Sequence, residues 1–110
     1  MENKKQFLAD LIEYRTKITS IRLSETAIPV FVAKVHGLIS YLNQVGGYNV
    51  HVDGLKQDII MVDRNIKLGW KPGTKGERHF NTCKRDVLTT LDSIISGVEY
   101  AINTWDSTQQ

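Results

Sequence analysis

Apolar side chains recur at alternating intervals of four and three residues in four stretches of this chain. Residues three and four apart lie on one face of a helix, so each stretch predicts an amphipathic helix. The predicted helices cover about 4–22, 28–45, 48–68 and 75–105. Their apolar faces are defined by Phe7, Leu11, Tyr14, Ile18 and Ile21; by Ile28, Val32, Val35, Ile39 and Leu42; by Tyr48, Val52, Leu55, Ile59, Val62 and Ile66; and by Val87, Leu91, Ile94, Val98, Ala101 and Trp105.

Short connections separate the predicted helices, and consecutive helices joined in this way pack as antiparallel neighbours. We therefore expect an all-α protein, a single-domain up-down four-helix bundle over residues 1–110. In this topology the first and third connections meet at one end of the bundle. Both termini and the second connection meet at the other end.

Residues that favour helix ends agree with this division. Asn3 with Gln6, and Thr74 with Glu77, have the three-residue spacing of a capping box at a helix start. Gly46–Gly47 predicts the end of the second helix, because glycine adopts a left-handed backbone conformation at little cost.

The stretch 48–70 also permits a second interpretation, an α+β fold with a small meander. Its segments YNVHV, DIIMV and IKLGW alternate in the way that short strands do. Gly54 would cost about 1 kcal/mol inside a helix. The helical spacing nevertheless matches more positions than the strand alternation does, so a helix is the preferred prediction.

The second and fourth helices have unusually wide apolar faces, with extra positions at Phe31, Leu38, Leu88, Ile95 and Ile102. A bundle of this size is not expected to bury all of them. The excess suggests a homodimer formed across these two helices.

Composition is that of an average globular domain, with 41% hydrophobic and 24% charged residues in a chain of 110. Cys83 is the single cysteine, which excludes an intrachain disulfide and suits a reducing compartment. Asp10 and Glu13 interrupt the apolar stretch after the first lysines, so no signal peptide is expected. No apolar run is long enough to span a bilayer. We expect a cytoplasmic protein without a membrane partner.

Charge changes this picture, because it is unevenly distributed although the net charge is only +2. The segment 64–85 has seven cations and one anion, hence +6, whereas the rest has seven cations and eleven anions, hence −4. The bundle topology places this segment at the end that carries the third connection. Its cations are Arg64, Lys67, Lys71, Lys75, Arg78, Lys84 and Arg85.

Lys75 and Arg78 are unexpected where they stand, because the first turn of a helix disfavours cations. The loop KPGTKGER, which leads into a helix start with free backbone N–H groups, has the features of an anion site. Trp70 precedes this loop, where a tryptophan more often covers the end of the core than offers an exposed surface for stacking or for a partner. The residues predicted to bind an anion, a nucleic acid or a partner are Lys67, Trp70, Lys71, Lys75, Arg78, His79, Lys84 and Arg85.

Catalytic and metal-binding patterns are weak. His79 and Cys83 are four residues apart on one helix face, but no further ligand or orienting group accompanies them, and Cys83 is expected in the core. The Glu-x-x-His pairs of di-metal bundles are absent. The carboxylates, Asp58 among them, are expected on solvated faces. We therefore expect no cofactor, no metal and no enzymatic activity.

These observations favour a non-enzymatic interaction protein, acting as an inhibitor, an adapter or an assembly subunit, that presents a rigid helical bundle with one basic end. A protein partner is the leading expectation. The alternative is binding of nucleic acid or of a phosphate-bearing ligand through the basic connection between the third and fourth helices.

Overall fold

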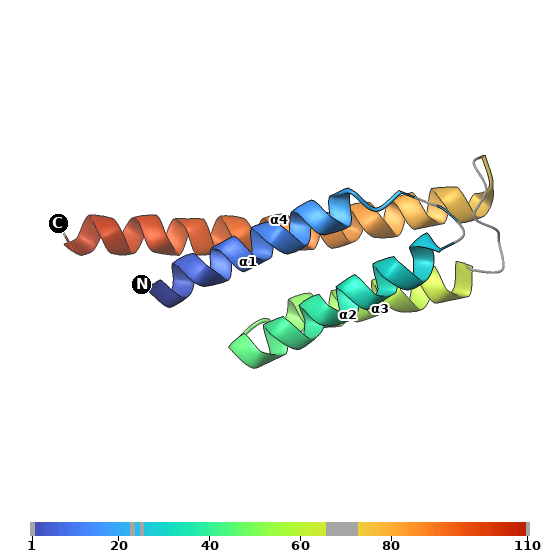
Figure 1. The fold of residues 1–110 in the computed structure, drawn as a ribbon. Helices are drawn as coiled ribbons and strands as arrows, with labels where there is room; N and C mark the ends of the chain where they lie inside the picture. Colours follow the sequence, from blue (N-terminus) through green and yellow to red (C-terminus); the bar gives the residue numbers. More distant parts are fainter. Residues whose placement is uncertain (1, 23, 25, 66–72, 110) are drawn as a thin grey trace.

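The computed structural model describes residues 2–22, 24, 26–65 and 73–109. These residues form the helices α1 (Glu2–Thr19), α2 (Ala27–Val45), α3 (Asn49–Asn65) and α4 (Lys75–Gln109), and no strand (Figure 1). The prediction of an all-α four-helix bundle is confirmed. The alternative meander at 48–70 is wrong wherever the chain is described, because α3 continues through Gly54 without interruption.

The four helices run alternately up and down the long axis of a molecule measuring 55 × 22 × 17 Å (Figure 1). Helix α4 packs against both α1 and α3, and α2 packs against α3, whereas α1 and α2 meet at fewer positions. The chain leaves α1 and enters α4 at the same end, on the right of Figure 1. Both termini and the turn between α2 and α3 lie toward the left. The described backbone of the basic segment, 64–65 and 73–85, lies toward the right of Figure 1.

The predicted apolar faces form one continuous core. Tyr14, Ile21, Val32, Tyr48 and Ala101 are half-buried, and the other predicted positions are buried wherever they are described. Ile66 and the side chain of Trp105 lie outside the described residues.

The expectation that the bundle would leave its wide faces uncovered is wrong. Phe31 and Leu38 are fully buried, Ile95 and Ile102 are 7% exposed, and Leu88 is half-buried. Phe31 packs edge-to-face on Phe80 of α4, with ring centroids 5.3 Å apart. The bundle therefore buries these side chains by itself, and the observation that suggested a homodimer no longer does so.

Helix α1 occupies 2–19, against a prediction of 4–22. At its end, Thr19 Oγ1 donates to the carbonyl of Arg15 at 2.7 Å, as Thr16 Oγ1 does to that of Ile12 inside the helix, and Ser20 Oγ donates to the carbonyl of Lys17 at 2.8 Å. The capping box expected at Asn3 is absent because the helix has already begun at Glu2.

Two predictions of helix ends are confirmed: the glycine end of α2 and the capping of the start of α4 by Thr74. Gly46 has φ +82° and donates its N–H to the carbonyl of Leu42 at 2.9 Å, which ends α2. At the start of α4, the backbone N–H of Glu77 donates to Thr74 Oγ1 at 3.2 Å. Helix α4 continues to Gln109, four residues beyond the predicted end.

Candidate functional site

The first three turns of α4 hold most of the predicted binding residues that the structure describes. Lys75, Arg78 and Arg85 are exposed. Arg78 and Arg85 are seven residues apart, which places them on the same side of the helix about 10 Å from one another along its axis. The helix therefore presents a short row of cations to solvent.

Lys84 lies on a different side of α4 and has a structural contact. Its ammonium Nζ donates a hydrogen bond of 2.6 Å to the backbone carbonyl of Ile21, which follows the end of α1. Burial lowers the pKa of this ammonium, and the positive charge of Arg22 lowers the pKa further. Lys84 therefore connects α4 to α1 and is less available to a partner than the sequence suggested.

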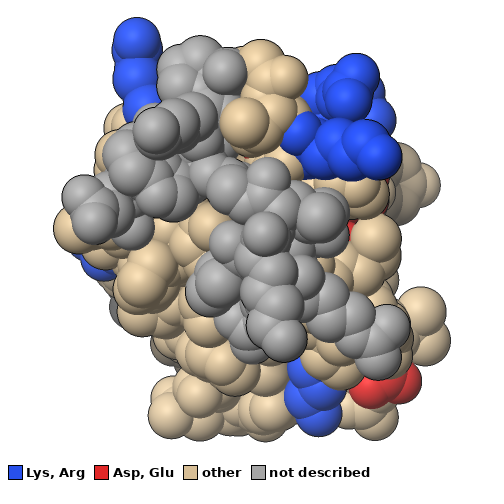
Figure 2. All heavy atoms as spheres, turned by 90° about the vertical axis from the view of Figure 1, so that its right-hand side faces the viewer, with Lys and Arg blue, Asp and Glu red and all other residues tan. Residues whose placement is uncertain are grey.

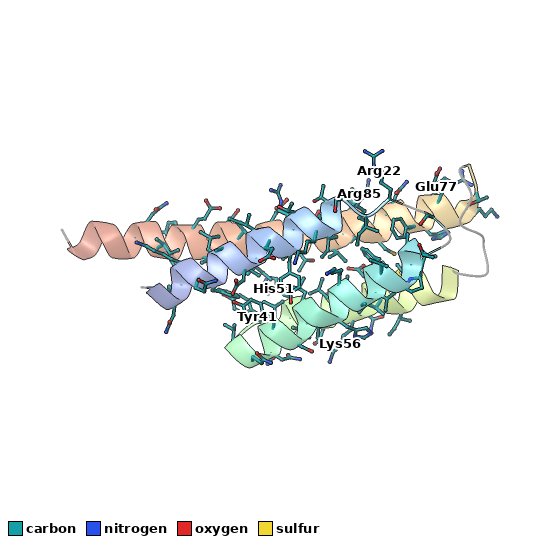
Figure 3. The ribbon with its side chains drawn as sticks, in the orientation of Figure 1. Arg22, Tyr41, His51, Lys56, Glu77 and Arg85 are labelled. Atoms are coloured by element: carbon teal, nitrogen blue, oxygen red, sulfur yellow. The ribbon has the colours of Figure 1, made fainter. Side chains whose placement is uncertain are left out.

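Arg22 belongs to this site although the sequence analysis did not select it. It is exposed, it lies close enough to Lys84 to lower that residue's pKa, and it points away from α2 and α3 together with Arg85 (Figure 3). The signal that could have found Arg22 is the topology, because the predicted bundle already placed the connection after α1 beside the start of α4. We call Arg22, Lys75, Arg78 and Arg85 the basic surface.

The members of the basic surface have no carboxylate partner within the described part of the chain. Ion pairs there join Arg15 to Asp92, at 2.7 Å, and Lys17 to Glu13, at 2.8 Å, and both lie outside the basic surface. Viewed onto this end, Lys and Arg atoms stand at several places along the rim, and Asp and Glu contribute little (Figure 2). The positive charge at this end is therefore not neutralised by those neighbours.

The start of α4 is already capped by its own side chains. Glu77 Oε1 accepts the backbone N–H of Gly73 at 3.1 Å, and Thr74 Oγ1 accepts that of Glu77. These contacts satisfy backbone donors that an incoming phosphate would otherwise use. The start of α4 therefore offers an anion two backbone donors fewer than the sequence suggested.

The remaining predicted site residues divide into two groups. His79 is exposed on α4. Lys67, Trp70 and Lys71 lie outside the described residues, as does the side chain of Arg64.

The His79–Cys83 pair does not form an activated thiol. Cys83 is 1% exposed, and burial raises the pKa of its thiol to about 11, with the carboxylates of Asp58 and Asp86 adding to the shift. The thiol is therefore protonated at neutral pH. Among the described residues no group of three or more His, Cys, Asp or Glu side chains is arranged to hold a metal ion.

Asp58 corrects one further expectation, because it does not lie on a solvated face. Only 8% of this residue is exposed, at the contact between α3 and α4. Burial raises the pKa of its carboxyl to about 6, and the negative charge of Asp86 contributes to the same effect. Asp58 is next to Ile59 and three residues after Leu55, and the approach of α4 covers it along with them.

The geometry defines a four-helix bundle with a cationic surface toward one end that has no carboxylate partner among the described residues. No protein-family model, curated protein or solved structure matches this chain. None of the helices in the described ranges combines the length and the hydropathy needed to cross a membrane.

Proposed function

We propose that this chain is a non-enzymatic binding protein that holds an acidic protein partner on its basic surface. Its role would be that of an inhibitor, an adapter or an assembly subunit. Arg78 and Arg85 stand on α4 and Arg22 follows the end of α1; all three side chains are exposed, and a partner that supplies carboxylates would form ion pairs with them.

The observation that carries this proposal is the absence of carboxylate partners for the basic surface in the described part of the chain. The two ion pairs that form there involve cations of α1. Arginine is the cation best suited to an interface, because its planar guanidinium pairs with carboxylates in a bidentate geometry. Three of the four residues of the basic surface are arginines.

The second candidate, binding of nucleic acid or of a phosphate-bearing ligand, has less support. The capping contacts of Thr74 and Glu77 occupy donors at the start of α4 that favoured it in the sequence. Nucleic-acid affinity also grows with the number of phosphates that cations neutralise, and the described basic surface is small. This candidate is retained as an outcome of the tests.

We further propose a cytoplasmic location and no catalytic role. The single cysteine is free and buried, which is compatible with a reducing compartment. The protonated state of Cys83 and the exposure of His79 support a binding rather than a catalytic role.

A direct test measures fluorescence anisotropy of a labelled polyglutamate peptide titrated with the protein at low salt. The variant Arg78→Glu/Arg85→Glu is compared with Lys5→Glu/Lys56→Glu, which changes the net charge equally at exposed lysines away from the basic surface. We expect the first variant to weaken binding at least about tenfold, because it replaces two attractive contacts by repulsion. The control should stay within about twofold of the wild type.

Equal losses in the two variants would show that net charge alone attracts the peptide, and would contradict the assignment to the basic surface. A labelled RNA of equal length serves as the second probe. Tight RNA binding that depends on Arg78 and Arg85, without peptide binding, would support the second candidate instead.

A further inference from the structure

The strongest feature outside the basic surface is a pocket between α1 and α2, which meet at fewer positions than the other neighbouring helices do. Its volume is about 300 Å³, near the lower limit of the sites that hold small molecules. It is lined by Asp10, Glu13, Tyr14, Lys17, Lys34 and Tyr41. We call this the α1–α2 pocket.

Two contacts fix how α1 and α2 face each other across the pocket. Tyr41 Oη of α2 donates a hydrogen bond of 2.5 Å to Asp10 Oδ2 of α1. One turn further along, the hydroxyl of Tyr14 lies over Gly37, only 3.4 Å from the place where a Cβ atom would be. Because the helices are antiparallel, Lys17 and Lys34 are the residues that follow at the next turn. Both cations therefore lie toward the same end of the pocket.

Two tyrosine rings form part of the pocket wall. The rings of Tyr14 and Tyr41 are stacked, with centroids 6.1 Å apart and planes inclined by 28°. Phe7 supports Tyr41 from the other side in an edge-to-face contact at 5.7 Å. Both tyrosines are half-buried, so each keeps some surface toward the pocket.

The charged side chains of the pocket differ in whether they have a hydrogen-bond or ion-pair partner. Asp10 accepts hydrogen bonds from Tyr41 and, at 2.9 Å, from Gln6, and Glu13 is paired with Lys17. Lys34 is half-buried and has no carboxylate partner among the residues that the structure places. Asp10 has no counter-charge either, but it accepts two hydrogen bonds, whereas Lys34 has neither a hydrogen bond nor an ion pair with the described residues. The charged group of the pocket that is left without a partner there is thus an ammonium beside tyrosine rings.

We propose that the α1–α2 pocket binds a small molecule that carries an anionic group on a single aromatic ring. The anion would pair with Lys34, and the ring would pack on Tyr14 and Tyr41. The volume accommodates one substituted ring rather than an extended chain. This site is separate from the basic surface, so its failure would leave the proposed function unaffected.

Two-dimensional ¹H–¹⁵N NMR of the full chain tests this proposal, with Gly37 as a resolved reporter on the pocket wall. The probes are 4-hydroxybenzoate and phenyl phosphate, which combine a ring with a carboxylate or a phosphate. We expect either or both to shift Gly37, Tyr14 and Tyr41, with a dissociation constant on the order of 1 mM for so small a ligand. The comparison of the two probes identifies the anion that the pocket prefers.

The controls test separately the ion pair with Lys34 and the packing of the ring on the two tyrosines. We expect p-cresol, which lacks the anion, and acetate, which lacks the ring, to bind at least about fivefold more weakly than the better probe. Lys34→Gln should weaken that probe by at least about fivefold, whereas Lys56→Gln on the exposed face of α3 should not change its affinity. An unchanged spectrum in the absence of probe shows that each variant is folded.

Three results would overturn the proposal. The first is the absence of shifts at the pocket residues up to about 20 mM of either probe. The second is equal binding of p-cresol, which would make the anion irrelevant. The third is full affinity in a folded Lys34→Gln variant.

Discussion

Asp58 is the single buried charged side chain among the described residues, and its ionisation opposes folding. Its pKa of about 6 in the folded chain lies above the ordinary value near 3.8. The folded state therefore binds more protons than the unfolded state between these values. The contribution of Asp58 to stability is fully present below pH 4 and is lost as the pH rises through 6.

This linkage predicts that Asp58→Asn stabilises the protein at pH 8 but not at pH 4. Each pKa unit corresponds to about 1.4 kcal/mol, so the shift from 3.8 to about 6 corresponds to a gain on the order of 3 kcal/mol in the free energy of unfolding at pH 8. Urea denaturation of both proteins at the two pH values measures it. Asp53→Asn, an exposed carboxylate of the same helix, is the matched control. A wild-type-like pH dependence in Asp58→Asn would contradict the burial of this charge.

Lys84 and Arg85 are neighbours in sequence with opposite expected roles. Lys84→Met keeps the aliphatic stem but removes the donor to the Ile21 carbonyl, which should lower the free energy of unfolding by about 1 kcal/mol. Arg85→Glu changes an exposed side chain and should alter stability by less than about 0.5 kcal/mol while weakening polyanion binding. Thermal denaturation together with the anisotropy titration separates the two effects. Loss of binding without loss of stability in Lys84→Met would reverse the assignment.

At the scale of elements, the glycines of α3 and of the α2–α3 turn serve different purposes. Gly54 lies in the middle of a helix with open space where a Cβ atom would stand, whereas Gly46 has φ +82° and ends α2. Gly54→Ala should raise the free energy of unfolding by about 0.5–1 kcal/mol, because alanine favours the helix. Gly46→Ala should lower it by about 1 kcal/mol, because it places a side chain in the left-handed region. Destabilisation by Gly54→Ala would contradict the continuous α3 helix.

The helices themselves were predictable because each apolar face repeats over several turns, and repetition makes the pattern insensitive to single residues such as Gly54. The C-terminal end of α1 was less predictable, since no glycine or proline stands close after Thr19 to mark it. The capping of α4 by Thr74 and Glu77 was predictable because all its partners lie within one turn.

The sites depend on contacts between helices, and a single sequence shows these poorly. Arg22 belongs to the basic surface although it is 63 residues from Arg85 in the chain. The α1–α2 pocket exists because Tyr14 and Tyr41, 27 residues apart, stack across an interface that is otherwise sparse. Asp58 is buried because α4 covers the edge of the apolar face of α3.

At the scale of the whole molecule, the bundle gathers cations toward one end of an elongated body, and the described residues supply them with no carboxylate partner. The basic surface and the α1–α2 pocket lie on different parts of it, so the two proposals can be tested separately. An elongated bundle with side-chain cations at one end can engage a partner without rearranging its core.

The central claim, that the basic surface holds an acidic protein, is tested most directly by affinity capture from lysate of the source cells, with and without nuclease treatment. The baits are the wild type, Arg78→Glu/Arg85→Glu and the equally charged control Lys5→Glu/Lys56→Glu. We predict an acidic protein that the wild type and the control retain and that Arg78→Glu/Arg85→Glu loses. Equal capture by all three baits, or capture that nuclease abolishes, would contradict the claim.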